Sequence, residues 1–217
     1  MAGSLTRLKD AYTDEARRLA ASSIEHLGET RITPTMLTTS GVLLCIAASA
    51  ITYFEHKAWW LFLVGSAVFT IGSLLDMFDG ALARVRGLVT PFGAFLDSTV
   101  DRVGEGFMLG AVALILMRDG SEWGVAVTIA AIAGSFLVSY TRAKAENMGL
   151  KGDVGLGSRA ERVAIIAIGV AMGSIGALPW MSLAVAVTSW ITVGQRVWSV
   201  KRQLDEGYQR LQQPPDA

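Results

Sequence analysis

The chain has 217 residues with 19 basic and 19 acidic side chains, so its formal net charge is zero. This balance excludes the strongly basic surface on which non-specific binding to nucleic acid depends, and no nucleic-acid partner is expected. Hydrophobic residues make up 52% of the sequence and the mean hydropathy is +0.43, yet charged residues still make up 18%. The apolar residues must therefore be gathered into blocks, as in an integral membrane protein.

Residues 1–30 are charged throughout and contain no apolar core of the length that a secretory signal needs. Apolar side chains recur among these charges at roughly helical spacing, at Leu5, Leu8, Tyr12, Leu19 and Ile24. This spacing predicts an amphipathic helix that lies on the membrane surface before the first span. A solvated tail is the alternative interpretation of the same segment.

Between residues 31 and 205 the sequence has apolar stretches of the length that a bilayer span requires, about 20 residues. We assign six spans, at residues 34–54, 58–82, 94–117, 123–148, 160–178 and 180–200. The connections are short, so consecutive helices should be antiparallel neighbours. The predicted fold is an all-α integral membrane domain of six transmembrane helices over 31–205, followed by a C-terminal cytoplasmic tail over 206–217.

Lysine and arginine are distributed unevenly between the two faces of the predicted bundle. The segments before the first span, between spans two and three, between spans four and five, and after span six, together with the adjoining ends of these spans, hold 17 of them. The opposite face has only Lys57 and Arg118. Because positively charged loops stay in the cytoplasm, we expect a multi-pass protein of the cell membrane with both termini on the cytoplasmic side.

Four aspartates interrupt the second and third apolar stretches, at Asp76, Asp79, Asp97 and Asp101. A charge at membrane depth is costly and therefore indicates function. The members of each pair are three or four residues apart, so each pair shares one helix face. If the two helices are antiparallel neighbours, all four carboxylates lie at similar depth near the cytoplasmic end. Their mutual repulsion then requires cations to offset it.

An oxygen-rich site of this kind suits Mg²⁺ or Mn²⁺ rather than zinc, because the segment from 76 to 101 contains no cysteine or histidine. Gly80 and Gly93 lack side chains and would let a bulky ligand approach the backbone. Arg84 offers a planar fork for phosphate oxygens. Together these features predict a phosphorylated substrate. The alternative is a set of helix-end ion pairs, such as Asp101 with Arg102.

The segment reads D-x2-D-G-x2-A-R-x8-G-x3-D-x3-D, with its fixed positions at Asp76, Asp79, Gly80, Ala83, Arg84, Gly93, Asp97 and Asp101. This run resembles the signature of the CDP-alcohol phosphotransferases. The resemblance implies a homodimeric membrane enzyme that transfers a phosphatidyl group from CDP-diacylglycerol to an alcohol and releases CMP. It also implies two divalent metal ions, held by Asp76, Asp79 and Asp97 with help from Asp101. Asp101 would in addition deprotonate the acceptor hydroxyl.

The same resemblance implies where the CDP-lipid binds. The start of the first span, "TPTMLT", is similar to the family's nucleotide-binding segment, and the signature supplies further contacts. The implied CDP-lipid contacts are Thr35, Met36, Leu37, Thr38, Asp76, Gly80, Ala83, Arg84 and Thr90.

A second polar set joins spans four and five and resembles the members of the family that use inositol phosphate as acceptor. Its pattern is S-Y-x-R-x-K-A-E followed by R-x-x-R. The resemblance implies an acceptor-phosphate site formed by Ser139, Arg142, Lys144, Arg159, Arg162 and Arg196. Inositol 1-phosphate is therefore the expected acceptor, because basic side chains suit a dianionic phosphate. Positive-inside topology is the alternative explanation for any one of these charges.

Three other functions remain open from the sequence. A glycerol 3-phosphate acceptor is the first, although that subgroup usually has a proline-containing "DP-x-A-D-K" where this chain has "DSTVDR". An ion-coupled transporter could use the acids as a cation path, but repeated halves or broken helices are not evident in the sequence. A structural membrane scaffold would leave the acidic residues without a role.

Overall fold

The computed structural model describes residues 33–155 and 158–212, and all regular secondary structure in this part of the chain is helical. The long helices are α2 (Pro34–Tyr53), α3 (Leu61–Val85), α4 (Pro91–Arg118), α5 (Glu122–Asn147), α6 (Arg159–Ala171) and α7 (Leu178–Gln212). Two short 3₁₀ turns, η1 (Phe54–Lys57) and η2 (Gly173–Ile175), follow α2 and α6. The all-α prediction is confirmed, whereas the amphipathic helix expected over 1–30 lies outside the described residues.

Within the described residues, three helices have the length and hydropathy needed to cross a membrane. They are Pro34–Lys57, which includes η1, Leu61–Val85 and Glu122–Asn147. Each lies within a few residues of a predicted span. For α4, α6 and α7 a membrane span stays a prediction, as does the total of six.

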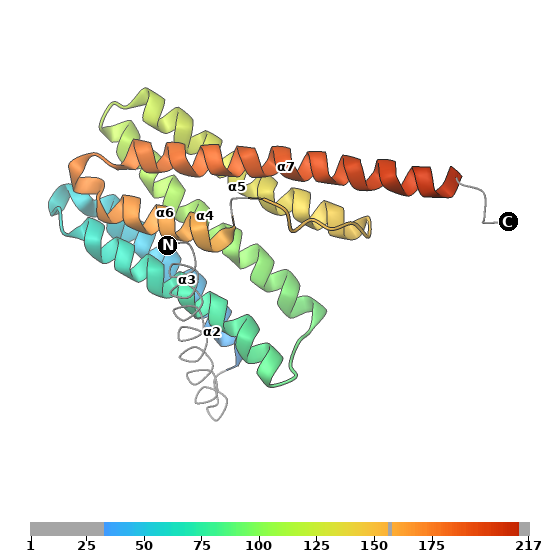
Figure 1. The fold of residues 1–217 in the computed structure, drawn as a ribbon. Coiled ribbons are helices and arrows are strands. Elements are labelled where there is room, and N and C mark those ends of the chain that lie inside the picture. The colour runs from blue at the N-terminus through green and yellow to red at the C-terminus, as the bar shows by residue number, and fades with distance from the viewer. Residues whose placement is uncertain (1–32, 156–157, 213–217) are drawn as a thin grey trace, which may run out of the picture.

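The last two helices differ in length from the predicted spans. Helix α6 ends at Ala171, because the chain turns through η2 and reaches Gly176, whose positive φ of 79° suits glycine. Helix α7 continues to Gln212 rather than ending near residue 200. No proline interrupts its polar continuation before residue 214, so the helix extends beyond the bundle (Figure 1).

Local sequence signals set the helix starts that matter for the site. Thr33 caps α2, accepting a hydrogen bond from the amide of Met36 at 3.2 Å. Thr90 caps α4 in the same way, from the amide of Gly93 at 3.0 Å. Each cap is followed by proline in the first turn. Ser158 begins α6 with a capping box, and this start makes Arg159 the first helical residue.

Glycines bring α2 and α3 into backbone contact near the acids. A Cβ built on Gly41 would lie 2.8 Å from the carbonyl oxygen of Gly72, and one built on Gly72 would lie 2.8 Å from that of Gly41. On α4, a Cβ at Gly104 would lie 3.1 Å from Cβ of Cys45. The Gly41 position is also 3.2 Å from Cβ of Asp76. Close packing of these three helices therefore surrounds the acidic residues.

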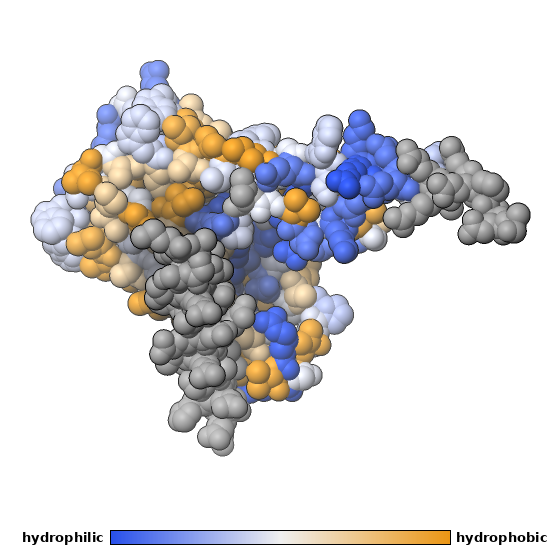
Figure 2. Space-filling view, in the orientation of Figure 1, coloured by the Kyte–Doolittle hydropathy of each residue, from blue (hydrophilic) through white to orange (hydrophobic). Residues whose placement is uncertain are grey.

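The end of the bundle opposite the acids carries aromatic side chains. Trp59 and Trp60 lie in the α2–α3 connection, while Trp123 and Trp180 stack edge to face near the starts of α5 and α7. Exposed tryptophans at one level are typical of a membrane interface. Figure 2 shows apolar residues over the bundle and hydrophilic residues over the projecting part of α7. Both features fit a membrane-embedded bundle.

Candidate active site

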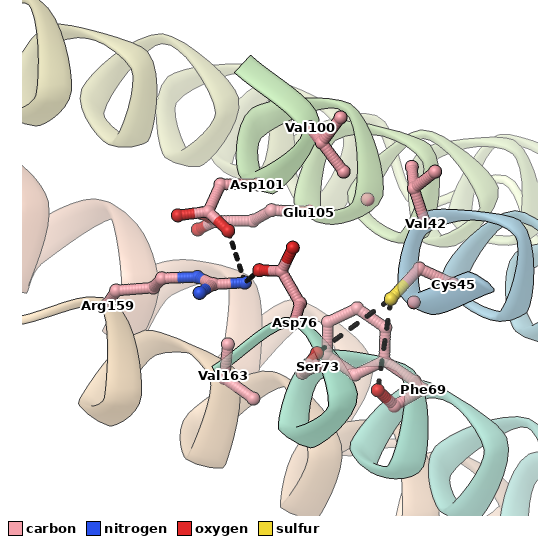
Figure 3. Close-up of a pocket in the computed structure, with 12 residues that line it drawn as sticks. Val42, Cys45, Phe69, Ser73, Asp76, Val100, Asp101, Glu105, Arg159 and Val163 are labelled. Carbon is pink, nitrogen blue, oxygen red and sulfur yellow. Dashed lines mark hydrogen bonds and ion pairs between the residues drawn. The ribbon is translucent and has the colours of Figure 1, made fainter. Parts of the chain in front are cut away.

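Three of the four sequence-predicted aspartates meet between α3 and α4. Asp76, Asp97 and Asp101 each offer a carboxylate oxygen, and these oxygens lie within 4.8 Å of one another. Asp76 is buried, whereas Asp97 and Asp101 are half-buried. Figure 3 shows Asp76 and Asp101 pointing toward one another from their two helices. Below, these three residues are called the carboxylate cluster.

The fourth aspartate, Asp79, is oriented from α2. It is buried at 3% exposure, and its Oδ2 accepts a hydrogen bond from the hydroxyl of Thr38. The same hydroxyl lies 3.0 Å from the carbonyl oxygen of Pro34. Thr38, which the family resemblance places at the CDP-lipid, therefore also orients one of the predicted metal ligands.

The donor set of the cluster fits a divalent metal. Oδ1 of Asp76 is buried and accepts no hydrogen bond in the structure. A buried acceptor without a partner is costly, and carboxylate oxygens so close together need a cation between them. Hard oxygen ligands of this kind match Mg²⁺ or Mn²⁺. The described residues thus provide a coherent binding site for such an ion.

The guanidinium of Arg159 contacts two of the three carboxylates in this cluster. Its Nη2 forms ion pairs with Oδ2 of Asp76 and Oδ1 of Asp101, as Figure 3 shows. The sequence prediction placed Arg159 at the acceptor phosphate, and the structure places it on two of the carboxylates. A second arginine, Arg102, approaches Oδ2 of Asp101 at 3.4 Å. A divalent metal would therefore compete with Arg159 for the same oxygens.

Sequence reasoning missed Glu105, a buried acid on α4. Nε of Arg162 donates to its Oε1 at 2.9 Å and Nη2 donates to its Oε2 at 3.2 Å. The hydroxyl of Ser135 on α5 donates to the same Oε1 at 2.9 Å. A signal was present, because Glu105 continues the four-residue spacing of Asp97 and Asp101 along α4. Arg162, predicted for the acceptor site, is thus brought next to the cluster as well.

The other predicted acceptor residues lie farther along α5 and α7. Arg196 is buried and donates from Nε to the carbonyl of Val154 at 2.8 Å and from Nη1 to the carbonyl of Val138. The Ser139 hydroxyl is half-buried and lies 3.5 Å from the Ser135 carbonyl. The structure leaves two of the set exposed, Arg142, which pairs with Glu146 at 2.9 Å, and Lys144.

The residues predicted to bind the CDP-lipid line the outer part of the same end of the bundle. Thr35 and Met36 are exposed in the first turn of α2, while Leu37 is buried. The nearest atom to a Cβ built on Gly80 is Nη1 of Arg84, at 3.8 Å, so the space beside this glycine is open. Ala83 is half-buried, and Arg84 and Thr90 are exposed. The structure therefore leaves room for a ligand along α3 beside the cluster.

Comparison with known proteins identifies the class. Residues 31–194 match the family model of the CDP-alcohol phosphatidyltransferases. This match covers most of the chain and includes all four aspartates and the arginines of α6. The chain belongs to this family of phospholipid-synthesising membrane enzymes.

Individual relatives narrow the comparison. The chain is 37% identical over 191 residues to the archaetidylinositol phosphate synthase of Pyrococcus horikoshii, covering 85% of this chain and 94% of that protein. It is 32% identical over 198 residues to the phosphatidylinositol phosphate synthase of Mycolicibacterium smegmatis, covering 88% and 86%. Both relatives are named for an inositol phosphate lipid product.

A solved structure shares the fold. The phosphatidylinositol phosphate synthase of Mycobacterium tuberculosis with CDP-DAG bound superposes with a TM-score of 0.73 at 30% identity, covering 84% of this chain and 94% of that one. The same enzyme in complex with manganese and citrate gives a TM-score of 0.72 at 30% identity, covering 83% and 88%.

Proposed function

We propose that this enzyme transfers a phosphatidyl group from CDP-diacylglycerol to inositol 1-phosphate and so forms phosphatidylinositol phosphate and CMP. The observation that carries the proposal is the carboxylate cluster with Arg159 and Arg162 beside it on α6. The acids suit the metal-bound pyrophosphate of a nucleotide donor, and the arginines suit an acceptor that is itself an anion. The names of the relatives point to the same product class.

In the proposed reaction, the acceptor hydroxyl oxygen forms a bond to the lipid-linked phosphorus of CDP-diacylglycerol. The bond from that phosphorus to the CMP oxygen breaks, and CMP leaves with the electron pair. Asp101 takes the hydroxyl proton, because its carboxylate is half-buried and lies at the α6 side of the cluster. When bound, Mg²⁺ or Mn²⁺ neutralises charge on the pyrophosphate oxygens.

The donor would lie along α3 and the start of α2. Gly80 leaves open space for the nucleotide, and exposed Arg84 can donate to phosphate oxygens from one turn further along the same face. Thr38 holds Asp79 in place for the metal. We assign two metal ions to the four aspartates, with Asp79 completing the cluster.

The proposed setting is the cytoplasmic leaflet of the cell membrane, where the basic end of the bundle lies. A homodimer is also proposed, on the family resemblance. A crosslinking experiment in native membranes, read out as a doubled mass on a denaturing gel, tests it. A monomer at all crosslinker concentrations would exclude the dimer.

A single assay tests the function. Purified enzyme in detergent receives Mg²⁺, CDP-diacylglycerol and one of four acceptors, namely inositol 1-phosphate, inositol, glycerol 3-phosphate or serine, and CMP release is measured. We expect turnover with inositol 1-phosphate and not with inositol, since an acceptor without phosphate would leave Arg159 without an anionic partner once a metal ion has taken Asp76 and Asp101. Faster turnover with glycerol 3-phosphate would replace the acceptor, and no CMP release with any alcohol would reject the activity. An ether-linked CDP-lipid in a parallel series distinguishes the two lipid classes in the relatives' names.

A further inference from the structure

Two acid–arginine pairs join α4 and α6 at successive levels. Asp101 and Glu105 are four residues apart on α4, and Arg159 and Arg162 are three apart on α6, so each helix presents its two side chains on one face. Arg159 pairs with Asp101, and Arg162 pairs with Glu105. The Glu105 pair is the deeper one, with 4% of the arginine and 8% of the glutamate side chain exposed.

The two pairs differ in whether their acidic residue is a predicted metal ligand. Asp101 belongs to the carboxylate cluster, so Arg159 would lose its partner oxygens if a divalent ion bound there. Glu105 accepts two hydrogen bonds from Arg162 and one from Ser135, which occupy both of its oxygens. Most of the acceptor sites of this carboxylate are therefore taken, and Glu105 is not one of the three acids whose oxygens lie close enough together to share an ion. The deeper pair would therefore remain closed when a metal ion opened the upper one.

We propose that Glu105 is a positioning residue that holds Arg162, and with it the first turn of α6, at the acceptor side of the carboxylate cluster. The inference deepens the proposed function and rests on it. Figure 3 shows Glu105 beside Asp101 and Arg159 in the pocket lined by α2, α3, α4 and α6. Glu105 acts through Arg162 and does not itself contact either substrate.

The physical reason lies in the length of an arginine side chain. A guanidinium on a flexible stem loses rotamer freedom when it binds phosphate, and a site that fixes the side chain beforehand avoids that loss on binding. Glu105 accepts hydrogen bonds from both Nε and Nη2 of Arg162, and this bidentate contact fixes the plane of the guanidinium. Ser135 then fixes the glutamate from α5.

Glu105→Gln tests the assignment. The amide retains the shape of the side chain, but its NH₂ group faces one of the arginine donors, so one hydrogen bond is lost and the buried cation is no longer neutralised. We expect the KM for inositol 1-phosphate to rise about tenfold or more, because a displaced Arg162 weakens acceptor binding. The KM for CDP-diacylglycerol and the Mn²⁺ affinity, measured by electron paramagnetic resonance, should stay within about twofold of wild type.

Glu206→Gln is the matched control. Glu206 also pairs with an arginine, Arg202, with Nε to Oε1 at 2.7 Å, but both side chains are exposed on the projecting end of α7. The control should leave both KM values unchanged. A purely structural role for Glu105 would lower the active fraction, so kcat alone would fall. An unchanged acceptor KM in Glu105→Gln, or an equal rise in both KM values, overturns the inference.

Ser135→Ala keeps the test decisive if Glu105→Gln does not fold. This variant removes one hydrogen bond to Glu105 without creating an unpaired charge, and the acceptor KM should rise about threefold while the donor KM stays constant. An acceptor KM equal to that of wild type rejects the inference. Failure of the proposed function gives a different result, because wild-type enzyme would then release no CMP with inositol 1-phosphate.

Discussion

At the scale of single residues, the guanidinium of Arg159 can pair either with the carboxylate cluster or with the phosphate of the acceptor. In the structure it pairs with Asp76 and Asp101, the oxygens that a divalent metal would take. In the proposed reaction the acceptor phosphate lies next to the same helix turn. Binding of the metal would therefore release Arg159 toward the acceptor, and the two events would favour one another.

Replacing Arg159 tests this competition. We expect Arg159→Gln to bind Mn²⁺ more tightly in the absence of substrates, by about tenfold, because no guanidinium has to be displaced from the carboxylates. Titration of free Mn²⁺ by electron paramagnetic resonance measures this affinity. Arg202→Gln, on the projecting end of α7, serves as the control with wild-type affinity. A weaker or unchanged affinity in Arg159→Gln would show that the arginine does not compete with the ion.

Asp101 has the proposed role of general base. Asp101→Asn retains the shape of the side chain but cannot accept the hydroxyl proton, so kcat should fall by about a hundredfold to ten-thousandfold. Binding of CDP-diacylglycerol, measured by its protection against thermal unfolding, should largely remain. CMP release at a near-normal rate would assign the proton transfer to another group.

At the scale of elements, the contact between α2 and α3 sets the spacing of the site. Because a Cβ at Gly41 would lie 2.8 Å from a backbone oxygen of the facing helix, the two helices must separate to accept it. This separation would also move Asp76 on α3 relative to α2. Both stability and metal binding should therefore depend on this glycine.

We expect Gly41→Ala to lower the stability by about 1–3 kcal/mol, the usual cost of overpacking, and to weaken Mn²⁺ binding. Thermal unfolding in detergent and the Mn²⁺ titration measure the two effects. Gly207→Ala is the matched control, because Gly207 is a helical glycine with no atom within 4 Å of a built Cβ. It should be neutral or slightly stabilising. Equal melting temperatures for the two variants would contradict the close-contact argument.

At the scale of the whole molecule, the two ends of the bundle differ in chemistry. Arg118 at the end of α4 contacts Glu55, His56 and the Tyr53 carbonyl, so the α2–α3 and α4–α5 connections lie together at the end that carries the tryptophans. The carboxylate cluster and the first turn of α6 lie toward the other end. The two ends of the bundle can therefore be labelled independently to test the proposed orientation in the membrane.

Cysteine labelling in intact cells tests the orientation. A cysteine introduced at Gly87, in the exposed α3–α4 connection, should react with a membrane-impermeant maleimide only after the cells are opened, whereas one at Lys57 should react from outside. The native Cys45 is buried and should stay unlabelled in both cases. The reverse pattern would place the active site on the outer face.

The sequence by itself determined the family and the helical class, and it singled out the four aspartates as candidate metal ligands. These inferences follow from apolar blocks of span length and from one motif of fixed spacing. The predicted spans begin within three residues of the observed helices, whereas the cap formed by Thr90 and Pro91, which starts α4 at residue 91 rather than 94, was not among the sequence predictions. Helix α6 is shorter and α7 longer than the spans predicted there, because hydropathy does not reveal where a glycine turn ends a helix early or where a polar helix continues past the bundle.

Only the tertiary structure decided which charged groups meet. Glu105 and Arg162 are 57 residues apart, and Asp76 and Arg159 are 83 apart, so neither pair is contained in any local pattern. Both depend on how α6 packs against α3, which brings its first turn within side-chain reach of α4. The sequence could place six basic and polar residues near an acceptor, but it could not distinguish Arg162, buried against an acid, from Arg142 at the surface. Such partners depend on helix packing, which brings distant side chains into a low-dielectric space where an unpaired charge is too costly to persist.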